Sequence, residues 1–180
     1  NGNDMLFAGA GNDSLLSGSG NDFVWAGTGN DIVFGGLGND TILADVGRDT
    51  VYAGAGDDRI DLRGGPNGND TRQNVAYGQD GADTIVSGAG SDSIYGGAGD
   101  DLIRSGRGRD SIDGGEGDDL ILLDAGLLYS WDRGYKFVAG GGGDDTIIGS
   151  ESNDSIVGQA GNDTLRGEGG QNVVRGGDGD

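Results

Sequence analysis

Aspartate recurs every nine residues through most of this 180-residue chain, and a regular row of carboxylates can bind protons or metal ions. In the stretch 8–61, six consecutive nine-residue segments carry Gly at the fourth place, Asp at the sixth and an aliphatic residue at the eighth. Fifteen segments join the Asp to an apolar residue two places on, and 14 of these have Gly two places before the Asp. The sixth-place aspartates are Asp4, Asp13, Asp22, Asp31, Asp40, Asp49, Asp58, Asp83, Asp92, Asp101, Asp110, Asp119, Asp145, Asp154 and Asp163.

The remaining composition narrows the chemistry that these carboxylates can perform. The chain has no His and no Cys, which removes imidazole-based nucleophilic triads, thiol chemistry and the usual zinc sites. Of the 31 acidic residues, three are Glu and 28 are Asp, a bias that indicates a short carboxylate at a fixed position of a turn. Rows of carboxylates beside backbone carbonyls suit a hard cation, and calcium accepts such mixed oxygen ligands.

The rest of each segment must hold the aspartates in position. The Gly-x-Gly half supplies backbone that can adopt positive φ, and the apolar eighth residue between two variable neighbours predicts a short strand with one side chain turned inward. Because the turns recur at a fixed spacing, successive strands should stack and the aspartates should fall into rows. The spacing alone therefore predicts a solenoid with acidic turns.

These segments resemble the nonapeptide G-G-x-G-x-D-x-U-x of the RTX (repeats-in-toxin) family. The resemblance implies an all-β, right-handed parallel β-roll with two nonapeptides per turn, so that each repeat lies over the next but one. It also implies calcium ions between stacked turns, held by the sixth-place aspartates and by carbonyls of the Gly-rich halves. One edge would then carry Asp4, Asp22, Asp40 and Asp58, and the other would carry Asp13, Asp31 and Asp49.

The same resemblance extends the metal site to glycine carbonyls. Counting aspartate pairs that are two repeats apart gives nine, so we expect about nine calcium ions, which would reduce the net charge from −20 to about −2. The glycines expected to contribute are Gly9, Gly11, Gly18, Gly20, Gly27, Gly29, Gly36, Gly38, Gly88, Gly90, Gly97, Gly99, Gly106 and Gly108.

The repeats fall into three blocks, 1–61, 77–122 and 140–180, separated by interruptions at 62–76 and 123–139. We expect residues 1–180 to form a single roll that is a fragment of a longer chain. In the first interruption, either Asp70 belongs to a degraded repeat, or 63–72 is a loop and Val75 is the inward residue. Pro66 and the neighbouring Asn-Gly favour the loop. In the last block Asn172 stands in the place of Asp.

The second interruption has two readings. It is either an irregular aromatic segment that packs on the roll or contacts a ligand or partner, or it continues the repeat with Gly134 at the fourth place, Lys136 at the sixth and Val138 at the eighth. The second reading needs another copy upstream, around Gly126, Leu128 and Ser130. It puts Lys136 two repeats before Asp154 and one position short of two repeats after Asp119. The ammonium of Lys136 would then replace calcium on the acidic edge. In the first reading Lys136 lies in solvent.

An apolar outer stripe is predicted on the first block. The ninth-place residues point opposite to the inward row, and they read Phe7, Trp25, Leu43 on one sheet and Leu16, Phe34, Tyr52 on the other. Such a row predicts a neighbouring domain or partner that covers it. The alternative is that the aromatic side chains merely stack along the ladder as strand formers.

Folding should depend on the metal. Ordering the backbone costs on the order of 1–2 kcal/mol per residue, whereas one buried aliphatic side chain per repeat returns only about 1.5–3 kcal/mol. The net charge of −20 also opposes compaction. We therefore expect a calcium-binding, calcium-folded module of a bacterial type I secreted, extracellular protein, non-catalytic by itself, with the secretion machinery and a neighbouring domain as partners.

The sequence also bears on other functions. The charge argues against nucleic acid, and no run of about 18 apolar residues suggests a membrane span. RTX repeats accompany secreted hydrolases, cytolysins and polysaccharide-modifying enzymes, but no His-Glu-x-x-His or Gly-x-Ser-x-Gly is present, so a catalytic domain would lie elsewhere. An adhesin or ice-binding face is the third alternative, although Thr28 is the only Thr at the third places of the first block.

Overall fold

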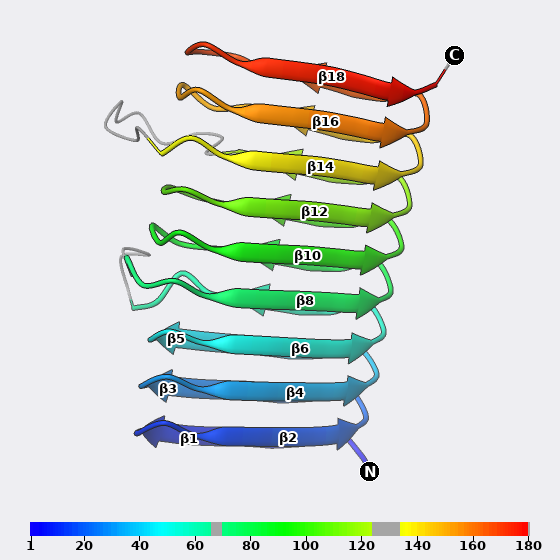
Figure 1. Cartoon of the computed structure of the whole chain (residues 1–180). Coiled ribbons are helices and arrows are strands. Elements are labelled where there is room, and N and C mark those ends of the chain that lie inside the picture. The colour runs from blue at the N-terminus through cyan, green and yellow to red at the C-terminus, as the bar shows by residue number, and fades with distance from the viewer. Residues whose placement is uncertain (66–69, 124–133, 180) are drawn as a thin grey trace.

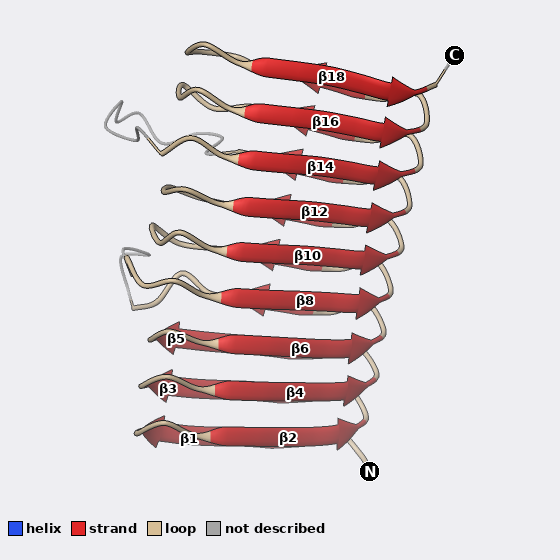
Figure 2. Cartoon of the chain, in the orientation of Figure 1, coloured by secondary structure: helices blue, strands red, loops and turns tan. Residues whose placement is uncertain are grey.

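The computed structural model describes residues 1–65, 70–123 and 134–179. All regular secondary structure in these residues is β-strand, and they contain no helix that is long and apolar enough to cross a membrane (Figure 2). The chain winds into a flattened solenoid of about nine turns, with the two termini at opposite ends of the stack (Figure 1).

Two parallel sheets form the faces of the solenoid, each with nine strands among the described residues. The first sheet contains β1 (Met5–Ala10), β3 (Phe23–Thr28), β5 (Thr41–Val46), β7 (Arg59–Asp61), β9 (Thr84–Val86), β11 (Leu102–Arg104), β13 (Leu120–Leu122), β15 (Thr146–Ile148) and β17 (Thr164–Arg166). The second contains β2 (Ser14–Ser19), β4 (Ile32–Leu37), β6 (Thr50–Ala55), β8 (Val75–Asp80), β10 (Ser93–Ala98), β12 (Ser111–Glu116), β14 (Phe137–Gly142), β16 (Ser155–Ala160) and β18 (Val173–Asp178).

The register of the sheets follows the repeat. Each strand pairs in parallel with the strand two places on, and inside a block the partners are two repeats apart, as in Leu6↔Val24 and Ile94↔Ile112. Every eighth-place side chain therefore lies beside its equivalent in the next turn. The predicted all-β parallel roll is confirmed.

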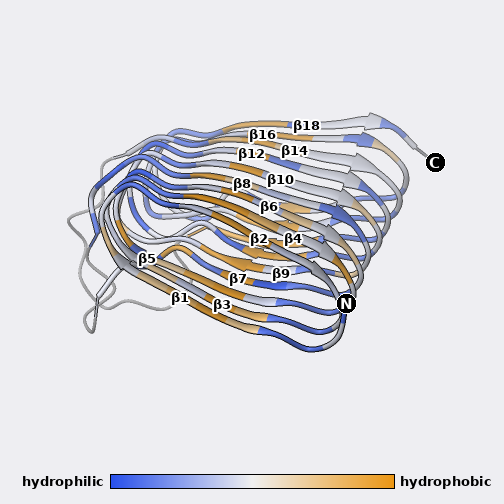
Figure 3. Ribbon diagram, turned by 90° about the horizontal axis from the view of Figure 1, so that it is seen from below, coloured by the Kyte–Doolittle hydropathy of each residue, from blue (hydrophilic) through white to orange (hydrophobic). Residues whose placement is uncertain are grey.

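The core lies between the two sheets and is formed by the eighth-place residue of each strand, joined on several strands by a small residue two places on, such as Ala26, Ala44 or Ala53. Eighth-place residues such as Val24, Ile42, Ile85 and Ile147 are fully buried. Their neighbours on the strand face outward, as the two-residue period of a strand requires. Figure 3 shows apolar colour along the strands and hydrophilic colour at the turns. Burial of one aliphatic side chain contributes about 1.5–3 kcal/mol.

Both interruptions enter the same edge of the roll. β6 pairs with β8 through Thr50↔Val75, and β12 pairs with β14 through Ser111↔Phe137, so the partners are separated by more than two repeats. The additional residues fall between β7 and β8 and between β13 and β14, so both precede a strand of the second sheet (Figure 1). The turns on the opposite side keep their usual length, so the roll closes without a break.

The phase expected after the first interruption is wrong by one residue. Ala76, and not Val75, is the inward residue: it pairs with Val51 and Ile94 and is fully buried. Val75 is partly exposed in the place before it, beside Thr50. Burial of the Ala76 methyl group in line with the core sets this phase. The Pro66 turn signal lies outside the described residues.

The predicted outer stripe is present, and on the second sheet its aromatic rings stack on one another. The ring planes lie within 8° of parallel, with centroid separations of 5.1, 4.9 and 4.8 Å along Phe34, Tyr52, Tyr77 and Tyr95. On the first sheet Phe7 meets Trp25 edge-on at 6.2 Å, and both remain exposed. Stacking along the ladder thus accounts for the aromatic residues of the second sheet, and coverage of the stripe by a partner stays a prediction.

Candidate metal sites along the two edges of the roll

The sixth-place residues lie at the two edges of the roll, where the chain passes from one sheet to the other. The first edge, where the chain enters the first sheet, carries Asp4, Asp22, Asp40, Asp58, Asp83, Asp101, Asp119, Asp145 and Asp163. The second edge, where the chain enters the second sheet, carries Asp13, Asp31, Asp49, Asn74, Asp92, Asp110, Lys136, Asp154 and Asn172.

From the second turn onward, one carboxylate oxygen of each sixth-place aspartate joins its turn to the preceding one. The backbone N–H of a sixth-place residue donates to Oδ1 of its neighbour one turn on, at 2.7 Å from Asp22 to Asp40 and at 2.8 Å from Asp101 to Asp119. Eight such bonds connect all nine aspartates of the first edge. They include Asp119 to Asp145, which are 26 residues apart. The first edge is therefore one unbroken ladder.

The other carboxylate oxygen has no such partner. In the described part of the chain, Oδ2 is buried and accepts no hydrogen bond in Asp13, Asp22, Asp31, Asp40, Asp49, Asp58, Asp83, Asp92, Asp101, Asp110, Asp119 and Asp145. A buried acceptor without a donor costs about 1–3 kcal/mol, and more when it is charged. Each of these oxygens therefore requires either a proton or a cation.

A backbone carbonyl faces the same space as Oδ2. A Cβ atom added to Gly96 would collide with Oδ2 of Asp101 and with the carbonyl oxygen of Gly114, one turn on. The same pair of collisions occurs at Gly78, Gly114, Gly140 and Gly158. Only glycine leaves this space open, and the space is bounded by a carboxylate and a carbonyl from consecutive turns. These first-place carbonyls were not among the expected ligands, although the Gly-Gly pairs that open many repeats could have indicated them.

The chemistry of this space fits calcium. Among the residues that the structure describes, no three acidic side chains gather at one point, so a cation would have to combine carboxylates with carbonyls. Mixed carboxylate and carbonyl ligands in an adaptable arrangement are typical of calcium. The aspartates and the glycine carbonyls thus fit the ion that the sequence indicated.

The glycines named from the sequence lie at the second and fourth places of the turns. Twelve of the fourteen have positive φ, for example Gly97 at 128° and Gly99 at 124°. Gly88 and Gly90 do not, and both lie on the second edge after the first interruption. The turns of the second edge therefore change conformation there, and the first-sheet strands from β7 onward are three residues long in place of six.

Burial raises the pKa of several of the sixth-place carboxyl groups. Desolvation raises the pKa of Asp83 and Asp119 to about 7 and that of Asp58 and Asp101 to about 6, and the hydrogen bonds from backbone N–H groups offset only part of this rise. Neighbouring carboxylates add to it. On the second edge, burial raises the pKa of Asp110 to about 8. Without a cation, these groups would hold protons close to neutral pH.

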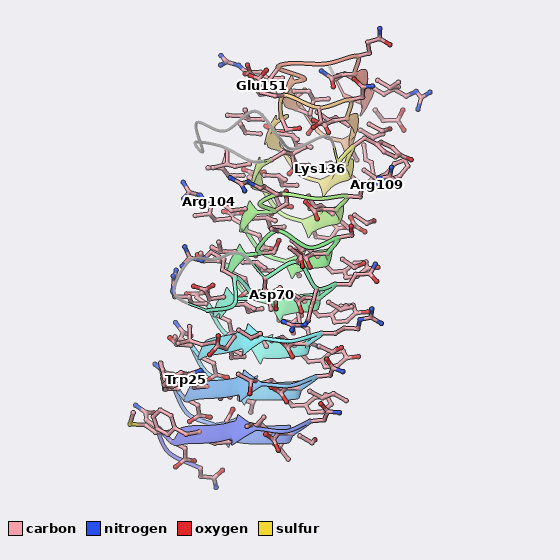
Figure 4. The ribbon with its side chains drawn as sticks, turned by 90° about the vertical axis from the view of Figure 1, so that its left-hand side faces the viewer. Trp25, Asp70, Arg104, Arg109, Lys136 and Glu151 are labelled. Atoms are coloured by element: carbon pink, nitrogen blue, oxygen red, sulfur yellow. The ribbon has the colours of Figure 1, made fainter. Side chains whose placement is uncertain are left out.

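Asp70 does not occupy a sixth place, because Asn74 does. Oδ1 of Asn74 accepts the N–H of Asp49, and the N–H of Asn74 donates to Asp92, both at 2.8 Å. Asp70 instead accepts the N–H of Gly47 at 2.8 Å and pairs with Arg72 at 3.0 Å. Asp70 thus supports the turn from inside the interruption, and Figure 4, which faces the second edge, labels it there.

Lys136 takes a sixth place on the second edge, as one of the two readings predicted. Its N–H donates to Oδ1 of Asp154 at 3.1 Å, and its side chain is fully buried with Nζ 3.9 Å from Oδ2 of Asp110. The prediction that Lys136 follows Asp119 in the row is wrong. Phe137 pairs with Ser111, so Lys136 lies next to Asp110, which precedes it by more than two repeats. The copy expected around Gly126, Leu128 and Ser130 lies outside the described residues.

Comparison with known protein families agrees with this geometry. A family model described as the RTX calcium-binding nonapeptide repeat, in four copies, matches residues 1–33, 34–71, 77–112, 95–126 and 148–180. A search of curated proteins finds no match. The matched residues include sixth-place residues of both edges.

Proposed function

The chain belongs to the RTX calcium-binding nonapeptide repeat family, and on this premise we propose a module that folds when it binds calcium between its turns. The observation that carries the proposal is the row of buried, unpartnered Oδ2 atoms that face backbone carbonyls of the next turn. The proposed ligands are the sixth-place aspartates of the two edges, together with carbonyls of the Gly-rich halves.

Calcium would act on two terms of the folding free energy at once. It would supply each buried Oδ2 with a cation, and it would reduce the repulsion of a chain with a net charge of −20. The stacked turns that share an ion are brought together only in the folded state, so binding free energy becomes folding free energy. A chain without calcium at neutral pH should therefore be unfolded or only partly folded.

The number of ions is bounded by the number of facing aspartate pairs. The two-repeat spacing gives nine pairs, and the ladder of the first edge adds Asp58 with Asp83 and Asp119 with Asp145. We therefore propose between nine and eleven ions. Eight of the pairs belong to the first edge, and the remaining three are 13/31, 31/49 and 92/110 on the second.

Secretion is the proposed context of this folding step. RTX repeat proteins are typically exported by type I secretion, and weak sites with Kd of about 10⁻⁴ to 10⁻³ M would stay empty in a cytosol low in calcium and fill outside the cell. The module would thus cross the envelope unfolded and fold in the extracellular medium. We propose that it is non-catalytic by itself and serves a neighbouring domain of the same polypeptide.

Far-UV circular dichroism during a calcium titration tests the folding proposal. We expect little strand signal in excess chelator and a cooperative gain of strand signal at submillimolar to millimolar calcium, whereas magnesium at equal concentration should produce much less because it requires a smaller, octahedral site. A strand signal that is the same in chelator and in calcium would refute the proposal.

A further inference from the structure

The last three turns of the second edge differ from every turn of the first edge. Their sixth-place residues are Lys136, Asp154 and Asn172, which we call the lysine stretch. On the first edge each sixth-place residue is Asp, and from Asp22 to Asp145 each leaves a buried Oδ2 without a donor. In the lysine stretch, groups of the chain itself contact the atoms that would otherwise face a cation.

The first of these groups is the ammonium of Lys136. The backbone of Lys136 is held in the row on both sides, since Phe137 donates to the carbonyl of Asp110 at 2.9 Å and Ser155 donates to the carbonyl of Lys136 at 2.8 Å. The side chain therefore has to enter the edge between the Asp110 and Asp154 turns. Its Nζ lies 3.9 Å from Oδ2 of Asp110, and both side chains are fully buried. A positive charge already occupies this position.

The second group is Ser150, which satisfies the carboxylate of Asp154. Oδ2 of Asp154 accepts the backbone N–H of Ser150 at 2.9 Å and its hydroxyl at 2.8 Å. Oδ1 of the same residue accepts the N–H of Lys136. Asp154 therefore has donors on both oxygens, in contrast to Asp101 at the same place of a first-edge repeat.

The third group is the amide of Asn172. Its Oδ1 accepts the N–H of Asp154 at 2.8 Å, so it continues the ladder as an aspartate would. Its Nδ2 donates to the carbonyls of Gly167 and Gly169, each at 2.7 Å. Turn carbonyls are among the oxygens that a calcium ion would bind, and here an amide N–H₂ group fills their acceptor capacity.

We propose that the lysine stretch binds no calcium, because the Lys136 ammonium, the two donors of Ser150 and the Asn172 amide take the part of the metal. This inference rests on the proposed function of the first edge, and it removes Asp154 from the set of calcium ligands. The two edges then respond differently to calcium: the first requires the ion along its whole length, whereas the second is held beside β14, β16 and β18 by the chain alone.

Three variants of the full chain test the inference by counting ions. Lys136→Asp replaces the ammonium with the ligand of a regular turn beside Asp110, so equilibrium dialysis should show one more calcium ion per chain than the wild type. Two further variants form a matched pair. Asp101→Asn changes a sixth-place residue of the first edge, and Asp154→Asn makes the same change on the second edge. Asp101→Asn should lose at least one ion, and Asp154→Asn should lose none.

The outcomes separate the two proposals. A loss of calcium in Asp154→Asn equal to that in Asp101→Asn, or no gain in Lys136→Asp, would overturn the inference and leave the first edge intact. No loss in Asp101→Asn would instead contradict the proposed function. If a variant fails to fold, anomalous scattering from wild-type crystals grown in calcium locates the ions directly. An ion bonded to Asp154 or beside Lys136 would refute the inference. Ions confined to other turns would support it.

Discussion

The backbone N–H of Asp58 donates to Oδ1 of Asp83 over 2.7 Å, although 25 residues separate the two aspartates. The additional residues between them enter the roll on the opposite edge, where Asn74 follows Asp49. The first edge consequently runs past the interruption without a gap. This relationship makes Asp58 and Asp83 a facing pair equivalent to those inside a block.

The pair leads to a prediction for Asp83→Asn. The amide would leave the sites on both sides of Asp83 with one charged oxygen fewer, so we expect the loss of one or two calcium ions and a several-fold higher calcium concentration at the midpoint of folding. Equilibrium dialysis and circular dichroism measure the two quantities. Asp80→Asn is the control, because Asp80 is exposed and outside the row. An unchanged ion count in Asp83→Asn would show that the interruption breaks the first edge.

Gly96→Ala should destabilise the roll strongly, although it adds only one methyl group. The new methyl group would enter the space between Oδ2 of Asp101 and the carbonyl of Gly114, where it would both overpack the turn and exclude a cation. We expect a loss of stability of about 1–3 kcal/mol from overpacking alone, with a further loss from the missing ion. Gly176→Ala changes the same place of the last repeat, where no atom lies within 4 Å. Chemical unfolding in saturating calcium should therefore separate the two variants, and equal stabilities would contradict the prediction.

The raised pKa values predict how the calcium-free chain responds to pH. The carboxyl groups of Asp83 and Asp119 have a pKa of about 7 in the metal-free roll, against 3.8 for an ordinary aspartate. Well below pH 3.8 these groups are protonated in both the folded and the unfolded state and do not oppose folding. As the pH rises toward 7, the unfolded chain ionises first, so the metal-free roll loses stability across this window.

Circular dichroism of calcium-free protein at pH 5 and pH 8 tests this sign. We expect more strand signal at pH 5 than at pH 8. At pH 8 we expect the strand signal to appear only when calcium is added. Calcium affinity should fall as the pH drops below 7, because protons compete for the same oxygens. A calcium-free chain that is better folded at pH 8 than at pH 5 would contradict the assignment of these buried carboxyl groups.

Tyr77→Ala tests the aromatic ladder of the second sheet. Tyr77 stacks on Tyr52 at 4.9 Å and on Tyr95 at 4.8 Å, and an aromatic pair contributes about 0.5–1.5 kcal/mol beyond burial. With two such pairs lost, the variant should lose about 1–3 kcal/mol of unfolding free energy in saturating calcium, and it should keep the wild-type ion count. Val157→Ala is the matched change at the same place of a repeat without a ring. A Tyr77 variant no less stable than Val157→Ala would mean that the rings stack without stabilising the sheet.

The nine-residue period of the sequence by itself determines the strand pairing and the aspartate rows inside each block. Gly at the fourth place, Asp at the sixth and an aliphatic residue at the eighth specify a turn, a ligand and an inward side chain, and a strict period makes each strand pair with its equivalent two repeats away. The inward row from Ile85 to Ile121 and the aspartate rows inside each block followed from the spacing. Covalent spacing is sufficient there because nothing intervenes between one turn and the next.

Only the tertiary structure shows which residue is inward after each interruption and which residue of the preceding turn it faces. The length of an insertion does not tell where the chain re-enters the sheet, because re-entry is set by burial and by the ladder of the neighbouring turn. Ala76 is inward because it completes the core between Val51 and Ile94. Lys136 faces Asp110 because β14 pairs with β12. Both insertions enter one edge, and for this reason the other edge remains a continuous row of nine aspartates.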